Sequence, residues 1–202
     1  MRGRALVMAV VAVALTSQAA AAGMLLQAEM VGTSIRLEIG ADPNRALAQV
    51  AGAGYLLRLD RGEVAELTGR RLIPAIAPAG GALTSPTLEQ WSEGPLVAGY
   101  GTTYHVLIRG ERICGEVLSS PWMTSFTEPL VRSLELLQAV LPILAPPRQG
   151  DCGTVGIRAY AGDGFPLMAS YRGDPVFEVT LLRFDHYPTE GPLHAPDASA
   201  AP

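Results

Sequence analysis

The amino-acid sequence predicts an α+β domain: a mostly antiparallel sheet built from hairpins and a C-terminal three-strand meander, with one long and one short helix packed on it. Short segments of alternating apolar and polar residues, separated by turn residues, predict the strands. Leucines at intervals of three and four between residues 130 and 144 predict the long helix, and capping residues between 42 and 52 predict the short one.

The N-terminal part of this domain is predicted to contain a strand followed by the short helix. Residues 34–39 alternate apolar and charged side chains, which is typical of a half-buried strand. In the segment 41–52, Asp42 is the expected N-cap, Pro43 the first helical residue and Gly52 the residue that ends the helix.

A hairpin and a long connection are predicted next. Residues 55–67 have the pattern of a hairpin, and 71–78 that of an extended segment in which Pro74 favours a sheet edge. Residues 78–95 are rich in Gly, Pro, Ser and Thr, so they are expected to form a loop, with one helical turn over 87–91, or a boundary between two lobes of a single domain.

The strongest hairpin signal lies between residues 103 and 118, where Gly110-Glu111 suits a type II′ turn. The register that follows from this turn pairs Arg109 with Arg112, Leu107 with Cys114, and His105 with Glu116. The opposite face is more apolar and is predicted to pack on the core; it holds Tyr104, Val106, Ile108, Ile113 and Val117.

The long helix is expected to begin at a capping box of Ser125 and Glu128, or at Thr127 with Pro129, and to end or kink at Pro142. The three-strand meander follows, in segments 154–160, 165–171 and 176–184. The single domain is thus predicted to span 23–187, and a Pro- and Ala-rich tail over 188–202 is predicted to be disordered.

The N-terminus has the three parts of a secretory signal peptide. Arg2 and Arg4 precede an apolar run over 5–15, and small residues ending at Ala22 form the expected cleavage site. Residues 1–22 are therefore predicted to be removed, which leaves about 180 residues for one domain of ordinary size. The mature protein is expected to be periplasmic or secreted and not an integral membrane protein, and its source to be a bacterium with a GC-rich genome, because all fifteen basic residues are arginine.

The two cysteines of the chain, Cys114 and Cys152, are expected to form a disulfide, as is usual in exported proteins. The bond would join the strand before the long helix to the segment after it. The alternative interpretation keeps Cys114 free as a nucleophile, with His105 as its base and Glu116 orienting the imidazole. That interpretation is weakened by the lack of a helix N-terminus or positive charge to activate a mid-strand thiol.

Composition excludes several functions. The absence of lysine excludes a Schiff base, an S-x-x-K acyl-enzyme site and a P-loop. Without Arg2 and Arg4 the net charge is about −6, from thirteen arginines against nineteen acidic residues, so nucleic acid is not an expected partner. No hydrolase, zinc-protease, redox or haem motif is present, and no cofactor or metal is expected.

Two remaining groups of residues are candidates for binding. Trp122, Met123 and Phe126 lie in one short connection; they would form a binding patch if exposed, although burial over the edge of the sheet is the favoured interpretation. A segment near the C-terminus carries residues of metal-ligating type, but its two prolines prevent a helical arrangement and solvated side chains are favoured. These residues are Asp185, His186, Glu190 and His194.

The sequence as a whole favours a non-enzymatic function. We expect an exported binding or accessory protein of the cell envelope or exterior, acting on an envelope or extracellular protein. The alternative is a cysteine-dependent hydrolase or transferase that uses Cys114, His105 and Glu116.

Overall fold

A computed structural model of the chain describes residues 23–69, 71–74, 86–123, 127–146, 148–149 and 152–186. The predicted signal peptide, residues 1–22, and the predicted tail, residues 188–202, lie outside the described residues.

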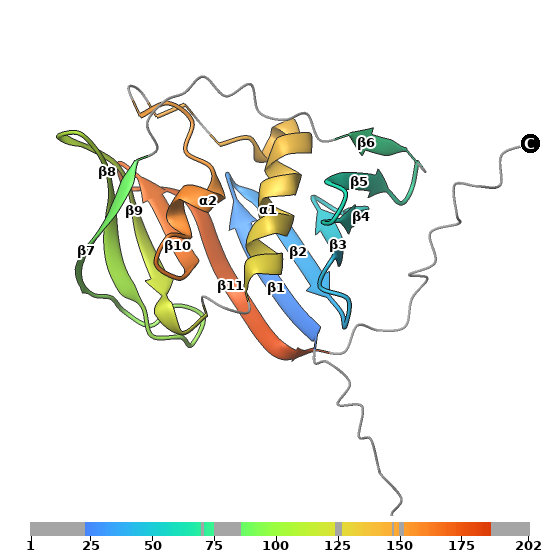
Figure 1. Ribbon diagram of the computed structural model, residues 1–202, viewed down its shortest axis with the longest axis horizontal. Helices are drawn as coiled ribbons and strands as arrows, with labels where there is room; N and C mark the ends of the chain where they lie inside the picture. Colours follow the sequence, from blue (N-terminus) through green and yellow to red (C-terminus); the bar gives the residue numbers. More distant parts are fainter. Residues whose placement is uncertain are drawn as a thin grey trace, which may run out of the picture.

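The described strands form one antiparallel sheet of eleven strands (Figure 1). Their bounds are β1 Gly23–Met30, β2 Thr33–Ile39, β3 Arg45–Val50, β4 Ala53–Arg58, β5 Glu63–Glu66, β6 Leu72–Pro74, β7 Thr87–Glu93, β8 Thr103–Arg109, β9 Arg112–Ser120, β10 Phe165–Tyr171 and β11 Asp174–His186. Their order across the sheet is β6-β5-β4-β3-β2-β1-β11-β10-β9-β8-β7.

This strand order consists of two meanders that are joined side by side through the first and the last strand. Every neighbouring pair is consecutive in the chain except the pair of β1 with β11, which joins the first strand to the last. The two edges of the sheet, β6 and β7, are themselves consecutive, and no hydrogen bond pairs them in the described sheet. These two edge strands therefore lie at opposite ends of the open sheet (Figure 1).

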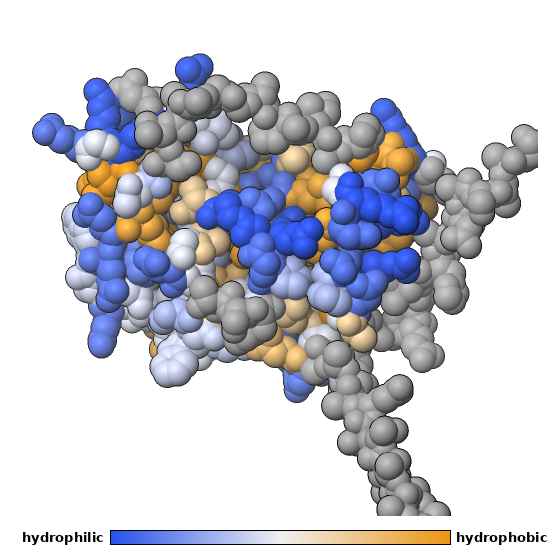
Figure 2. Space-filling view, viewed as in Figure 1, coloured by the Kyte–Doolittle hydropathy of each residue, from blue (hydrophilic) through white to orange (hydrophobic). Residues whose placement is uncertain are grey.

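The hydrophobic core fills the concave face of the sheet. The long helix α1 (Glu128–Val140) lies across this face, and the single turn α2 (Ile157–Tyr160) lies beside it (Figure 1). The single turns η1 (Pro121–Met123) and η2 (Pro142–Leu144) precede and follow α1 in the chain. The leucines of α1 are buried against the sheet, and its outer surface is hydrophilic (Figure 2). Arg132 also donates a hydrogen bond to the carbonyl of Leu59, 2.6 Å away, in the β4–β5 connection.

The α+β prediction is wrong. A single sheet holds eleven strands, whereas the described chain contains only α1 and the one-turn α2 as α-helices. The predicted short helix after Asp42 is instead β3, whose Ala46, Ala48 and Val50 are buried on one face and pair with β2. Alternating burial against two neighbouring strands outweighs the local helix-start signal of Asp42 and Pro43.

The C-terminal three-strand meander is also wrong, because only its second and third strands form. Segment 154–160 contains a bridge residue and α2, while β10 and β11 form a hairpin. The Gly-rich approach to α2 carries Ile157 and Tyr160 into the core, where a helical turn buries both side chains. The helical turn expected over 87–91 is likewise incorrect, since these residues belong to the edge strand β7.

The β8–β9 hairpin forms, but its predicted register fails beyond the turn. Arg109 pairs with Arg112 as expected; Leu107, however, pairs with Gly115, and His105 with Val117. The cause is a β-bulge at Cys114, which adds one residue to β9 and shifts all later pairs by one position. At the turn, Gly110 has a positive φ of 62°, as the first central position of a type II′ turn requires.

The bulge also changes which face packs on the core. The inner face holds Leu107 and Val117, together with His105, and all three are buried. The bulge moves Val117 from the face that was predicted to pack on the core to this inner face. The other residues of the predicted core face point outward, and Ile113 among them is more than half exposed. Burial in the core therefore does not account for the apolar residues on the outward face of the hairpin.

The other elements agree with their predictions. The hairpin of β4 and β5 turns at Arg61-Gly62, and β6, which includes Pro74, is an edge strand. Helix α1 begins after Thr127 with Pro129 in its first turn, and it ends before Pro142. The Thr127 hydroxyl donates to the carbonyl of Met123, so the side chain of Thr127 does not cap the helix in the usual way.

Candidate functional site

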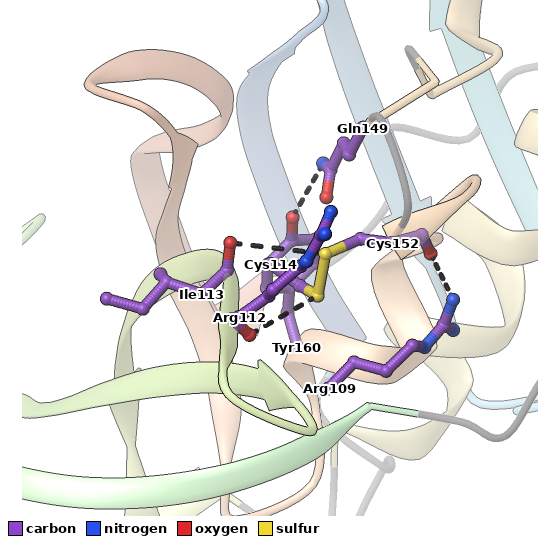
Figure 3. The surroundings of a disulfide bond; sticks show 7 residues. All are labelled: Arg109, Arg112, Ile113, Cys114, Gln149, Cys152 and Tyr160. Atoms are coloured by element: carbon purple, nitrogen blue, oxygen red, sulfur yellow. Dashed lines mark hydrogen bonds between the residues drawn. A yellow bond between two sulfur atoms is a disulfide. The ribbon is translucent and has the colours of Figure 1, made fainter.

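The bond predicted between Cys114 and Cys152 is present, with the two Cα atoms 5.5 Å apart (Figure 3). It joins the bulge of β9 to the segment just before α2, and both cysteines are buried. Arg109 donates to the carbonyl of Cys152 at 2.7 Å, which adds a second link between the β8–β9 hairpin and the same segment. These contacts indicate that the disulfide has a structural role, in which it holds the β8–β9 hairpin against the segment before α2.

The close packing beside the disulfide depends on a glycine. A Cβ atom at Gly115 would lie 2.9 Å from a ring carbon of Tyr160, 2.9 Å from its hydroxyl oxygen and 3.2 Å from the carbonyl oxygen of Ser170. The Tyr160 hydroxyl accepts a hydrogen bond from Gln149 at 3.1 Å, and burial raises the pKa of Tyr160. The bulge of β9 is thus fitted against the turn of α2.

The structure does not bring the alternative catalytic set together. The sulfur of Cys114 is bonded to Cys152, so no thiolate is available for attack. His105 lies on the inner face of the sheet, whereas Glu116 is one position away on the outer face, where it pairs with Val106 and Ser170. The bulge at Cys114 separates the proposed base from the group that was expected to orient it.

His105 has other polar neighbours on the inner face. Its Nδ1 atom lies 3.9 Å from a carboxylate oxygen of Asp163, which is mostly exposed in the turn before β10. Burial lowers the pKa of His105, and the charge of Asp163 opposes that shift. Ser119, which lies on the same face of the neighbouring strand, is fully buried, and neither its hydroxyl nor the ring nitrogens of His105 has a described hydrogen-bond partner.

Ser119, His105 and Asp163 are residue types of a serine hydrolase, but their placement does not suit one. A nucleophilic hydroxyl must contact substrate, and the side chains of Ser119 and His105 are 0% and 2% exposed. These groups are better described as a buried polar patch in the wall of the core.

The predicted aromatic patch is divided by the fold. Trp122 is 84% exposed in η1, whereas Met123 is 2% exposed and belongs to the core. Phe126 lies outside the described residues. The favoured prediction of burial is therefore wrong for Trp122, because η1 turns this side chain away from the sheet while it turns Met123 toward it.

Trp122 is one of three exposed large apolar residues around the same end of β7–β9. The pairs Glu93–Thr103 and Thr103–Ser119 show that the connection after β7 and the turn after β9 leave the sheet at one end. Leu96 in that connection is 75% exposed, and Trp91 at the bulge of β7 is 57% exposed. We call Trp91, Leu96 and Trp122 the end surface.

A pocket of about 240 Å³ lies next to the end surface, on the outer face of β8, β9 and β10. It is lined by Tyr104, Glu116, Val117, Leu118, Met168 and Ser170. The Trp91 and Tyr104 rings meet edge to face with their centroids 6.2 Å apart, so the pocket is continuous with the end surface. Burial raises the pKa of Tyr104, as do the charge of Glu116 and the hydrogen bond between the two side chains.

Sequence reasoning missed this pocket because it assigned the apolar outer residues of β8 to the core. The sequence did contain an indication of the pocket, because both faces of the hairpin are apolar. Tyr104 and Leu118 alternate with buried core residues on the same strands. A sheet with one face in water is expected to be polar on that side.

The residues of metal-ligating type near the C-terminus are only partly described. Asp185 and His186 end β11, and Glu190 and His194 lie outside the described residues. Within the part of the chain that the structure describes, no three His, Cys, Asp or Glu side chains come together as a metal site. None of the described helices has the length and apolarity needed to cross a bilayer.

Comparison with known proteins finds no match: no family model, no curated protein and no solved structure is significantly similar to the chain.

Proposed function

We propose that the chain is an exported, non-enzymatic binding or accessory protein of the cell envelope or exterior, and that it contacts a protein partner through the end surface. The observation that carries this proposal is the exposure of Trp122, at 84%, in a chain with only two tryptophans. Clustered exposed apolar side chains mark interaction surfaces, and tryptophan contributes more than most residues to binding energy.

Two further features support the location. The disulfide of Cys114 and Cys152 is a bond that persists in oxidising compartments and is rare in the cytosol. The N-terminal pattern of basic, apolar and small residues is that of a cleaved secretory signal. Together they favour a periplasmic or secreted protein.

The proposal is tested by retention of a partner from an envelope extract of the source organism. The immobilised mature chain is compared with a variant that carries Leu96→Ser and Trp122→Ser, both at exposed positions that should not disturb folding. We expect the wild-type chain to retain a reproducible protein and the variant to lose it.

The matched control is Leu72→Ser, which removes an equally apolar side chain, 54% exposed, from β6 at the opposite edge of the sheet. Partner retention should survive this change. If the end-surface variant and the control retain the same protein equally well, the end surface is not the binding site and the proposal fails.

A further inference from the structure

The outer face of the sheet changes character between its two halves. On β1, β2 and β3 one outer ladder consists of the polar residues Gln27, Arg36 and Gln49. On β8, β9 and β10 the corresponding ladder consists of Tyr104, Leu118 and Met168, all half-buried around the outer pocket. Because the first half shows that this sheet has an ordinary solvent face, the second half is a local exception that requires its own explanation.

The outer pocket combines apolar walls with one carboxylate. Leu118 and Met168 face each other across β9 and β10, and Glu116 lies one ladder further along, opposite Ser170. Glu116 contributes to the raised pKa of the neighbouring Tyr104 and has no ion pair with a described residue. A volume of about 240 Å³ admits a single long side chain.

Two further glutamates pair with residues of the strands that form the pocket. Glu89 pairs with Val106 on one side, and Glu178 pairs with Met168 on the other. Glu178 also stands directly opposite Glu29 in the next strand, an arrangement of like charges that destabilises a sheet. Neither Glu29 nor Glu178 has an ion pair with a described residue, so a cation bound here would relieve the repulsion.

We propose that the outer pocket receives an arginine side chain of the partner protein, flanked by apolar residues that pack on the end surface. The aliphatic stem would lie between Leu118 and Met168, and the guanidinium would donate to Glu116. A planar guanidinium offers two parallel donors that match a carboxylate, and its stem buries readily against apolar walls. Trp91, in contact with Tyr104, provides an aromatic surface for the same cation.

A partner protein fits these features better than a small cation does. The pocket is continuous through Tyr104 and Trp91 with a surface larger than one side chain, and that surface is apolar. This inference rests on the proposed function, because it names the chemistry by which the same surface would recognise its partner.

The test uses the full mature chain with methyl-labelled methionine and follows the Met168 signal by NMR, assigned through Met168→Leu. Two acetylated and amidated peptides are titrated, Leu-Arg-Leu and the same peptide with citrulline, which keeps the shape of arginine but lacks its charge. We expect the arginine peptide to shift the Met168 signal to saturation, with an affinity about tenfold higher than that of the citrulline peptide.

Substitutions then test whether the carboxylate of Glu116 is the group that binds the arginine peptide. Glu116→Gln should reduce the affinity for the arginine peptide to the level of the citrulline peptide, and Glu66→Gln on β5, near the opposite edge, should leave it unchanged. If Glu116→Gln does not fold, raising the salt concentration provides the same comparison, because only the charged peptide should lose affinity.

Equal responses to both peptides, no response of Met168 to either, or an arginine response that survives loss of the Glu116 charge would each overturn the arginine assignment. These results would leave partner binding through the end surface intact. Conversely, partner retention that does not depend on Leu96 and Trp122 would remove the proposed function, whatever the peptides show.

Discussion

At the scale of single residues, Gly115 fixes how closely the β9 bulge approaches α2. Gly115→Ala places a methyl group 2.9 Å from the Tyr160 ring and 3.2 Å from backbone, and we expect it to lower the free energy of unfolding by about 1–3 kcal/mol. Gly101→Ala is the matched control, since nothing lies within 4 Å of its Cβ position, and it should change stability by less than about 0.5 kcal/mol. Urea unfolding of both variants measures the difference, and equal effects would refute the packing argument.

His105 is expected to make stability depend on pH. Its folded pKa lies below the unfolded value of 6.5 because burial disfavours the charged ring, so the unfolded state binds the proton more readily. Stability is therefore complete above pH 6.5 and falls as the pH drops from 6.5 toward the folded pKa, by at most about 1.4 kcal/mol per pH unit.

Two substitutions test whether His105 causes this pH dependence of stability. His105→Leu should flatten the free energy of unfolding between pH 7.5 and 5.5, and Asp163→Asn should steepen it by removing the carboxylate that favours the charged ring. The free energies are measured by urea unfolding at each pH. A slope that is the same in all three proteins would assign the pH dependence to other groups.

At the scale of elements, the helices are tied together by Arg158. This residue of α2 donates to both carboxylate oxygens of Glu128, at 2.8 and 2.9 Å, and to Glu135 at 2.7 Å, both on α1. Hydrogen bonding by Arg158 is the main cause that lowers the pKa of Glu128 below its ordinary 4.5. The stabilisation is accordingly present above pH 4.5 and is lost as the pH falls through the folded pKa of Glu128.

Arg158→Gln should therefore lower stability at pH 7 by about 1 kcal/mol or less, because the three side chains are partly exposed. The loss should shrink in 1 M sodium chloride, where charges are screened within about 3 Å. Unfolding at low and high salt measures both effects. A loss that is independent of salt would show that Arg158 acts through packing rather than through charge.

The elements also show which local signals in the sequence were reliable. The leucine spacing predicted α1 and the Gly110 turn predicted the β8–β9 hairpin, since each pattern is decided by neighbouring residues. The helix-start signal at Asp42 and Pro43 failed because β3 gains more from pairing with β2 and β4 on both sides. The bulge at Cys114 has no local signature in the sequence, so the register of the β8–β9 hairpin beyond the bulge could not be predicted.

At the scale of the molecule, the pairing of β1 with β11 joins the first strand to the last and holds all eleven described strands in one sheet. This pairing does not follow from the sequence, because pairing of distant strands depends on the complete set of contacts and not on any one segment. The outer pocket could not be predicted for the same reason. Its walls come from β8, β9 and β10, and α1 separates β10 from the other two strands in the sequence. The cysteine pair was the one long-range contact that composition could predict.

The disulfide is expected to stabilise the whole sheet. It closes a loop of 38 residues that contains α1, and in the chain-entropy model such a bond contributes about 4 kcal/mol. The double variant with Cys114→Ala and Cys152→Ala should lose about this amount in urea unfolding. Adding reductant should lower the stability of the wild-type chain but not of the double variant; equal sensitivity would contradict a structural role for the bond.

The central claim is that the chain binds a protein partner through the end surface, and site-specific photo-crosslinking in the source organism tests it most directly. A benzophenone amino acid is placed at Trp122 and, in a separate protein, at Leu72, which is also exposed but lies at the opposite edge. We predict a reproducible adduct with one protein from position 122 and none from position 72. No adduct from position 122, or the same adducts from both positions, would contradict the claim.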